Sequence, residues 1–212
     1  MVDQAPTPVT AALSKVTSHL PGGGEARPGQ VQMAEAVGRA IKDRRHLIVQ
    51  AGTGTGKSLA YLVPVLLSGQ KVVIATATKA LQDQLADNDL PLLADHLGVE
   101  VEFSVLKGRS NYLCVQKARE TAGNETLDLG GEHGGDTARQ LRRVLEWART
   151  SPTGDRAELD FEPSPRVWAQ LSTTSTDCPG ALRCPAGEVC FAEDARRRAE
   201  AAAVVVVNTH LY

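Results

Sequence analysis

Eight consecutive residues have the types and order of a loop that binds nucleotide phosphates. The glycines let the backbone curl until successive N–H groups point inward at an anion. The lysine that follows can reach the β- and γ-phosphates, and the next serine can ligate Mg²⁺. The first position of the motif has alanine instead of glycine, but this position is the most permissive one. The alternative interpretation of these residues is a glycine-rich turn that matches the motif by chance. The eight residues are Ala51, Gly52, Thr53, Gly54, Thr55, Gly56, Lys57 and Ser58.

The four cysteines form a second group with metal chemistry. Cys178, Cys184 and Cys190 are evenly spaced, with five residues between neighbours, and Cys114 precedes them. Four thiolates can close one tetrahedral zinc site or hold one [4Fe–4S] cluster. Structural zinc favours tighter pairs of cysteines, so the wide spacing favours a cluster. Zinc and unrelated buried cysteines remain open alternatives.

Two polar residues precede a helix that the sequence predicts before the phosphate loop. Apolar residues recur at helical spacing over residues 31–41, with Arg27 and Gln30 just ahead of them. A glutamine amide donates and accepts at once, as the edge of adenine requires. A solvent-facing role for Gln30 is the alternative interpretation.

Short apolar segments separated by helices predict an α/β fold that would position these groups. We expect a strand at residues 46–50 before the phosphate loop and a helix after it, which Pro64 should bend or end. Further strands are expected at residues 71–76, 99–106 and 203–207, and helices between them. Consecutive apolar residues in such strands indicate a parallel sheet covered by helices on both faces.

Composition narrows the class of protein. The chain has 212 residues, 42% of them hydrophobic, and a formal net charge of −2, so there is no global basic field for nucleic acid. The N-terminus lacks the apolar core of a signal peptide. The longest aliphatic run, residues 201–207, is too short to span a bilayer. We therefore expect a cytoplasmic protein without a membrane partner.

Taken in order, these motifs resemble the amino-terminal part of an iron–sulfur superfamily 2 DNA helicase of the DinG/XPD type. Each piece alone is modest evidence, whereas the ordered set is highly specific. The similar segments are residues 27–30 (the adenine-reading Q motif), 51–58 (motif I), 75–85 (motif Ia), 107–114 with Cys114 (the first cluster ligand), Cys178, Cys184, Cys190 and Phe191 (the other ligands and their flanking aromatic), and 202–211 (the strand that returns to the motor core).

The resemblance implies a phosphate-loop NTPase of the RecA-like type with an inserted, mainly helical iron–sulfur domain. ATP and Mg²⁺ would be held by Lys57 and Ser58, the catalytic pair, and the cysteines would hold a [4Fe–4S] cluster. Thr76, Thr78 and Gln82 of motif Ia would contact single-stranded DNA. The implied activity is ATP-dependent translocation and unwinding of single-stranded or forked DNA, 5′ to 3′.

The same resemblance divides the chain into four regions: an N-terminal extension (residues 1–26), the first part of motor domain 1 (27–106), the cluster domain (107–190) and a returning helix and strand (191–212). Two departures stand out. Thr209 occupies a position where the family usually has histidine. The acidic box that holds Mg²⁺ in such motors, and the second motor domain, are absent from this sequence, so we expect an incomplete motor that is inactive alone.

Two other functions remain compatible with the residues. One is a different phosphate-loop enzyme with a zinc site. This interpretation gives the segment that resembles motif Ia no role. The other is a nucleic-acid-binding module with a redox-sensitive cluster, which would bind DNA without ATP.

Overall fold

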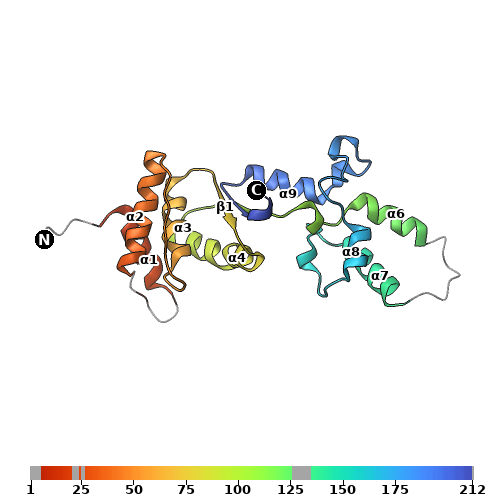
Figure 1. The fold of residues 1–212 in the computed structure, drawn as a ribbon, viewed down its shortest axis with the longest axis horizontal. Coiled ribbons are helices and arrows are strands. Elements are labelled where there is room, and N and C mark those ends of the chain that lie inside the picture. Colours follow the sequence, from red (N-terminus) through yellow and green to blue (C-terminus); the bar gives the residue numbers. More distant parts are fainter. Residues whose placement is uncertain (1–5, 21–23, 25–26, 126–134, 212) are drawn as a thin grey trace. The chain divides into compact units, whose positions relative to one another are not determined.

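The computed structural model describes residues 6–20, 24, 27–125 and 135–211. The chain divides into two compact units. Unit 1 comprises residues 1–105 and 201–210, and unit 2 comprises residues 106–200 (Figure 1). Residue 211 groups with unit 2.

Unit 1 begins with helices whose starts are marked in the sequence. Helix α1 (Pro8–Ser18) is capped by the Thr7 side chain, which accepts a hydrogen bond from the Thr10 N–H. Helix α2 (Pro28–Asp43) also starts with proline, whose missing N–H costs nothing in the first turn. Helix α3 (Lys57–Ser68) begins after Gly56. The core packs α1, α2 and α3 together through Leu13, Ala34 and Leu62 among others.

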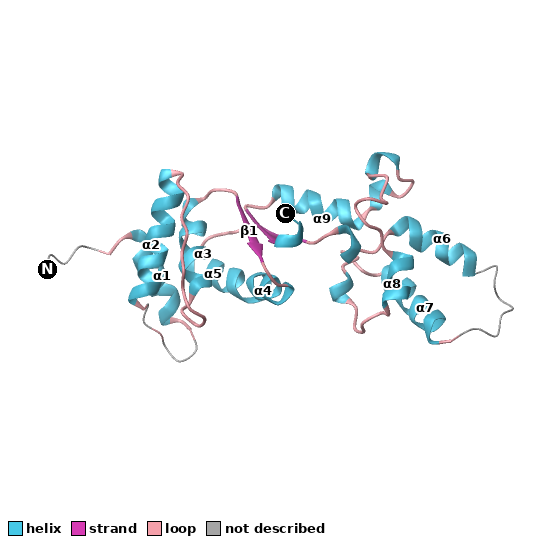
Figure 2. Ribbon diagram, in the orientation of Figure 1, coloured by secondary structure: helices cyan, strands magenta, loops and turns pink. Residues whose placement is uncertain are grey.

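The sheet of unit 1 has the order β1-β3-β2. Strand β1 (Val72–Thr76) is parallel to β3 (Val204–Asn208), in a register that pairs Val72 with Val204. Strand β2 is Phe103–Leu106. The valines of β3 are buried, as expected for a strand with neighbours on both sides. Figure 2 shows these strands in magenta with helices beside them. The prediction of a parallel α/β sheet is confirmed.

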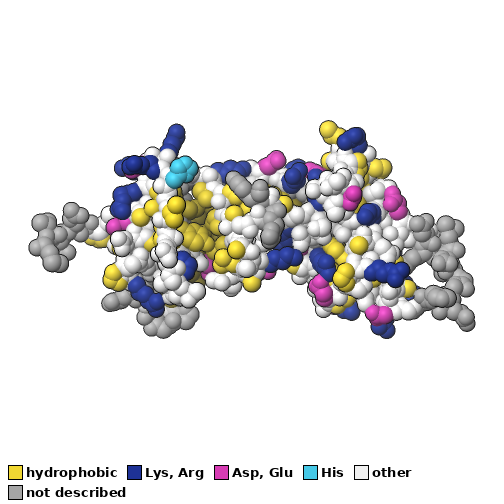
Figure 3. Space-filling view, in the orientation of Figure 1, with side chains coloured by type: hydrophobic (Ala, Val, Ile, Leu, Met, Phe, Trp, Pro, Cys, Tyr) yellow, Lys and Arg dark blue, Asp and Glu magenta, His cyan; other side chains and the backbone are white. Residues whose placement is uncertain are grey.

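The strand expected at residues 46–50 is a wrong prediction. The structure assigns no strand there, and the Ile48 side chain is 97% exposed. An apolar run forms a strand only beside another strand that pairs its backbone, and the described sheet has none next to it. Figure 3 shows hydrophobic side chains gathered on this unit. Its exposed large apolar residues are Leu47, Ile48, Val49, Leu67 and Val73.

Two further boundaries differ from the prediction. Helix α3 continues past Pro64 to Ser68, because buried neighbours such as Leu62 and Leu66 hold the turn in place despite the missing hydrogen bond. The strand expected over residues 99–106 shortens to β2.

The helical segment that follows β1 is continuous but changes its type along its length. It runs as α4 (Lys79–Gln84), a π-helical turn (Leu85–Asp89) and α5 (Leu90–Leu97). In the π turn the Leu90 N–H bonds to the Leu85 carbonyl, five residues back. The extra residue keeps Leu85, Leu90 and Leu93 all in the core.

Unit 2 is helical in the part that the structure describes. Its helices are α6 (Val115–Glu125), α7 (Asp136–Ala148), α8 (Pro165–Leu171) and α9 (Phe191–Ala201). Three-residue 3₁₀ turns separate the later cysteines, Ala181–Arg183 and Gly187–Val189. A core around Val144, Trp168 and Leu171 holds α7 and α8 together.

No helix among the described residues has the length and apolarity needed to cross a membrane.

Replacing Gly187 with alanine is expected to destabilise unit 2 by about 2 kcal/mol, the usual cost of overpacking. A Cβ at Gly187 would lie 2.0 Å from the Ala181 backbone oxygen, which the turn cannot easily move. Both tryptophans, Trp147 and Trp168, lie in unit 2, so urea unfolding followed by tryptophan fluorescence reports this unit.

Gly123→Ala is the matched control, because a Cβ on this helical glycine meets no atom within 4 Å. It should leave stability unchanged or raise it slightly. Equal unfolding midpoints for the two variants would contradict the close contact at Gly187.

Candidate functional site

The phosphate loop adopts the backbone shape that its glycines permit. Gly54 and Gly56 have φ values of 71° and 75°, in the left-handed region, and α3 starts at the next residue. The Lys57 ammonium group donates hydrogen bonds to the carbonyls of Ala51, at 3.3 Å, and Gly52. Thr55 Oγ1 donates to the Gly52 carbonyl at 2.9 Å. The lysine side chain thus lies inside the curl of the loop.

Arg27 and Gln30 both reach the loop, although 20 or more residues separate them from it in sequence. Arg27 Nη1 donates to the Gly54 carbonyl at 2.9 Å, and Gln30 Nε2 donates to the Gly56 carbonyl at 3.0 Å. Gln30 is buried, and a Cβ at Gly56 would lie 2.1 Å from its amide nitrogen. These contacts fix the loop at the start of α3.

A cavity of about 550 Å³ opens beside these residues. It is lined by α2, by the exposed run before the loop and by the loop itself, and Arg27, Gln30 and Thr55 contribute to its wall. The structure therefore brings the predicted adenine-reading residues and the predicted phosphate loop together around one hollow of unit 1.

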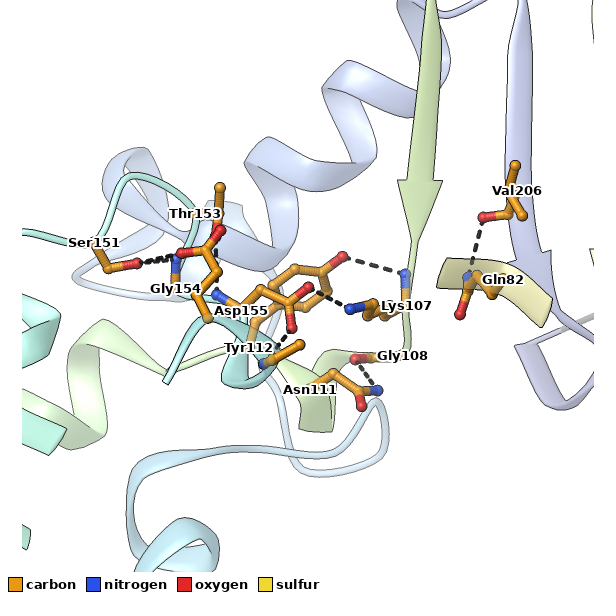
Figure 4. Close-up of polar contacts among 12 residues, drawn as sticks. Gln82, Lys107, Gly108, Asn111, Tyr112, Ser151, Thr153, Gly154, Asp155 and Val206 are labelled. Carbon is orange, nitrogen blue, oxygen red and sulfur yellow. Dashed lines mark hydrogen bonds and ion pairs between the residues drawn. The ribbon is translucent and has the colours of Figure 1, made fainter. Parts of the chain in front are cut away.

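The three residues predicted to contact DNA are in different environments. Thr76 Oγ1 donates to the Val207 carbonyl at 3.2 Å. Gln82 Nε2 donates to the Val206 carbonyl, also at 3.2 Å (Figure 4). The two residues are 3% and 1% exposed, so in this structure Thr76 links the end of β1 to β3 and Gln82 links α4 to β3. Thr78 differs, because it is exposed and caps α4 by accepting the Leu81 N–H.

All four cysteines line one cavity of unit 2, about 400 Å³ in volume. Cys114 immediately precedes α6, and the N–H groups of Gln116 and Lys117 donate to its sulfur. Burial raises the pKa of the Cys114 thiol, while those N–H groups act in the opposite direction. No three His, Cys, Asp or Glu side chains of the described residues meet closely enough to share a single ion.

Arg109 projects into the same cavity and is held by Glu193. The hydrogen bond with Glu193 raises the pKa of Arg109, and the nearby Cys178 and Cys190 sulfurs act in the same direction. Arg109 Nη1 is buried and has no hydrogen-bond partner among the described residues. A buried donor without a partner costs about 1–3 kcal/mol, which an acceptor in the cavity would recover.

A polar network fixes the segment that leads to Cys114 (Figure 4). Lys107 Nζ pairs with Asp155 Oδ2 at 2.7 Å, and the Lys107 N–H donates to the Tyr112 hydroxyl at 3.2 Å. Asn111 Nδ2 donates to the Gly108 carbonyl at 3.1 Å. Burial raises the pKa of Tyr112, so its hydroxyl stays protonated at neutral pH. The sequence analysis missed Arg109, Asp155 and Glu193, because nothing local marks partners so distant along the chain.

The chain is similar in sequence to known helicases. The DEAD/DEAH box helicase family model matches residues 28–125. The chain is 44% identical over 202 residues to an ATP-dependent helicase DinG of Mycobacterium tuberculosis, covering 88% of this chain and 30% of that protein. It is 38% identical over 191 residues to the ATP-dependent DNA helicase YoaA of Escherichia coli, covering 90% and 29%. A 3′-5′ exonuclease DinG of Bacillus subtilis is 32% identical over 167 residues. The chain thus spans about 30% of the length of the first of these relatives.

Proposed function

The chain belongs with the DinG- and YoaA-type DEAD/DEAH box helicases, and on this premise we propose that it supplies the ATP-binding loop and the cluster-bearing insertion of an ATP-dependent DNA helicase. The observation that carries the proposal is the convergence of Arg27, Gln30 and Lys57 on one phosphate loop. A zinc-containing phosphate-loop enzyme would not need the motif Ia segment after β1.

The nucleotide would be held by the groups that now stabilise the loop. Lys57 would exchange its bonds to the Ala51 and Gly52 carbonyls for the β- and γ-phosphates. Ser58 would ligate Mg²⁺, which neutralises phosphate charge during transfer. Arg27 and Gln30 would keep the loop open toward the neighbouring cavity, where adenine would lie.

Single-stranded or forked DNA is the proposed substrate. Thr78, the exposed residue that caps α4, is the motif Ia residue that would contact a phosphate. Thr76 would contribute by holding β1 against β3, and Gln82 by holding α4 against β3, rather than by touching DNA. Contacts of this kind read the backbone and not the bases, so no sequence preference is expected. Movement 5′ to 3′ remains an expectation from the resemblance.

A [4Fe–4S] cluster is the proposed group for the cysteine cavity. Cys114, Cys178, Cys184 and Cys190 would ligate it, and the buried Nη1 of Arg109 suits an acceptor such as a thiolate or sulfide. The wide spacing of the cysteines along the chain fits a cluster better than a structural zinc ion, which favours tight pairs of cysteines. When bound, the cluster would tie together the separate segments that carry the cysteines.

The first experiment measures iron, acid-labile sulfide and zinc per chain in protein purified without oxygen. Iron and sulfide at about four each are expected for a cluster. One zinc without sulfide would favour the zinc-containing enzyme instead. Single-strand binding is then measured against salt, with and without nucleotide. In a helicase motor, bound nucleotide should change the affinity for single-stranded DNA. DNA affinity that is the same with and without ATP would favour the redox-sensitive binding module.

A further inference from the structure

Arg109 is held in the wall of the cysteine cavity by a partner from another element. Its Nη2 donates to Glu193 Oε1, and the two side chains are only 14% and 20% exposed. Glu193 lies in the first turn of α9, three residues after Cys190, whereas Arg109 lies five residues before Cys114. The ion pair therefore joins the segment that carries the first cysteine to the segment that carries the last.

The backbone that carries Arg109 is fixed as well. Residues Arg109–Asn111 form a 3₁₀ turn, which the Tyr112 N–H closes by donating to the Arg109 carbonyl at 3.0 Å. The indole Nε1 of Trp168, a residue of the unit 2 core, donates to the Ser110 carbonyl at 2.7 Å. With its backbone and its Nη2 both bonded, the guanidinium group has a defined position in the cavity wall.

Nη1 of the same guanidinium group differs from the other charged groups of the cavity. Lys117 Nζ donates to a backbone carbonyl at 2.6 Å. The carboxylates of Glu120 and Asp177 belong to exposed residues and accept hydrogen bonds from neighbouring side chains. Arg109 Nη1 is buried and has no partner among the described residues. It is thus a donor that the cavity leaves for a bound group.

A fixed positive charge at this place has an electrochemical consequence. Reduction of a [4Fe–4S] cluster by one electron adds one negative charge to the cavity. The potential of that step depends on the net charge nearby and on hydrogen bonds to the sulfur atoms. Water screens a buried cation weakly, so its attraction for the added electron is large. Arg109 therefore favours the reduced form, and the negative charge of Glu193 opposes it.

We infer that Arg109 sets the reduction potential of the proposed cluster, with its Nη1 donating to a sulfur atom in the cavity and its charge partly balanced by Glu193. The inference rests on the proposed cluster and adds to it a control of the potential by two residues that are not ligands.

The test is a redox titration of the chain, loaded with iron and sulfide and kept without oxygen. Dithionite supplies the electron, and the electron paramagnetic resonance signal of the reduced cluster measures the reduced fraction. Arg109→Gln keeps a neutral donor but loses the charge. At the midpoint potential of the unaltered chain, its ratio of reduced to oxidised cluster should fall about tenfold, which corresponds to a shift of about 59 mV to more negative potential.

Glu193→Gln should shift the midpoint in the opposite direction. The amide oxygen of glutamine can still accept from Arg109, while the opposing negative charge is gone, so the reduced form gains stability. An ion pair with a merely structural role would not give shifts of opposite sign, because loss of either partner would loosen the cavity in the same way.

Arg183→Gln is the matched control for charge. Arg183 lies between Cys178 and Cys184 in sequence, but it is exposed, so water and salt screen its charge. Its midpoint should stay close to that of the unaltered chain. Arg109→Lys keeps the positive charge without the planar guanidinium group, and its midpoint should lie between those of Arg109→Gln and the unaltered chain.

Iron and sulfide are counted for every variant, which separates the two levels of the argument. An unshifted midpoint in Arg109→Gln chains that retain iron would overturn the role of Arg109 while leaving the cluster in place. If Arg109→Gln chains lost their iron, the Glu193→Gln midpoint would decide, and a value equal to or more negative than that of the unaltered chain would contradict the inference. Absence of iron and sulfide from the unaltered chain would overturn the proposed cluster, and this inference with it.

Discussion

With the proposed cluster bound to the four cysteines, Cys178→Ser is expected to remove iron and sulfide from the chain. Hydroxyl oxygen is a poor substitute for thiolate at iron, and a cluster with three cysteine ligands is readily lost in air. Cys178 lines the cavity together with the other three cysteines, and its sulfur lies near Arg109. Iron per chain should fall from about four to near zero. The visible absorbance of the cluster should disappear with it.

Leu182→Ala is the matched control for this experiment. Leu182 lies between Cys178 and Cys184 in sequence, but its side chain is fully exposed and touches nothing that the cavity needs. The control should therefore keep its iron. Full iron content in Cys178→Ser would contradict the four-cysteine site, and equal losses in both variants would point to a general defect of the loop.

Lys57→Ala is expected to lower nucleotide affinity by at least a hundredfold. Removing the ammonium group takes away the charge that would pair with two phosphates; each close charge-assisted bond contributes about 1.5–3 kcal/mol. The fold should survive, because the carbonyls of Ala51 and Gly52 lie in an exposed loop where water can replace the lysine. Fluorescent ADP binding measures the loss, and circular dichroism checks the helices.

The control for charge alone is Lys42→Ala, in the last turn of α2. It removes an equal charge from unit 1 away from the phosphate loop, so affinity should change little. If Lys57→Ala bound ADP as tightly as Lys42→Ala, the assignment of residues 51–58 as the phosphate site would be wrong.

Local chemistry made much of unit 1 predictable. Apolar spacing over residues 31–41 predicted α2, which in the structure begins earlier, at Pro28. Glycines followed by lysine predicted the loop that precedes α3. The valines before Asn208 predicted β3. Each of these features depends on residues close together in sequence.

The rest depended on partners that no local pattern reveals. Residues 46–50 have the composition of a strand, but a strand also needs a neighbour to pair with. Gln82 is polar and follows an exposed turn, yet its amide is taken by a carbonyl of β3, more than a hundred residues later. Helix α8 was not predicted from the sequence, because a helix of seven residues that starts with proline shows little apolar periodicity.

The spacing of the cysteines has a consequence for how the protein is made. Cys114 is far from Cys178 in sequence, so a cluster bound to both would close a loop of roughly 60 residues and restrict the unfolded chain by about 4 kcal/mol. Correct folding of unit 2 would then depend on iron supply. Chains made during iron shortage should be cut by proteases within residues 115–177, whereas loaded chains should resist. Sensitivity to protease in a cell extract would thus report the fraction of the protein that has received its metal.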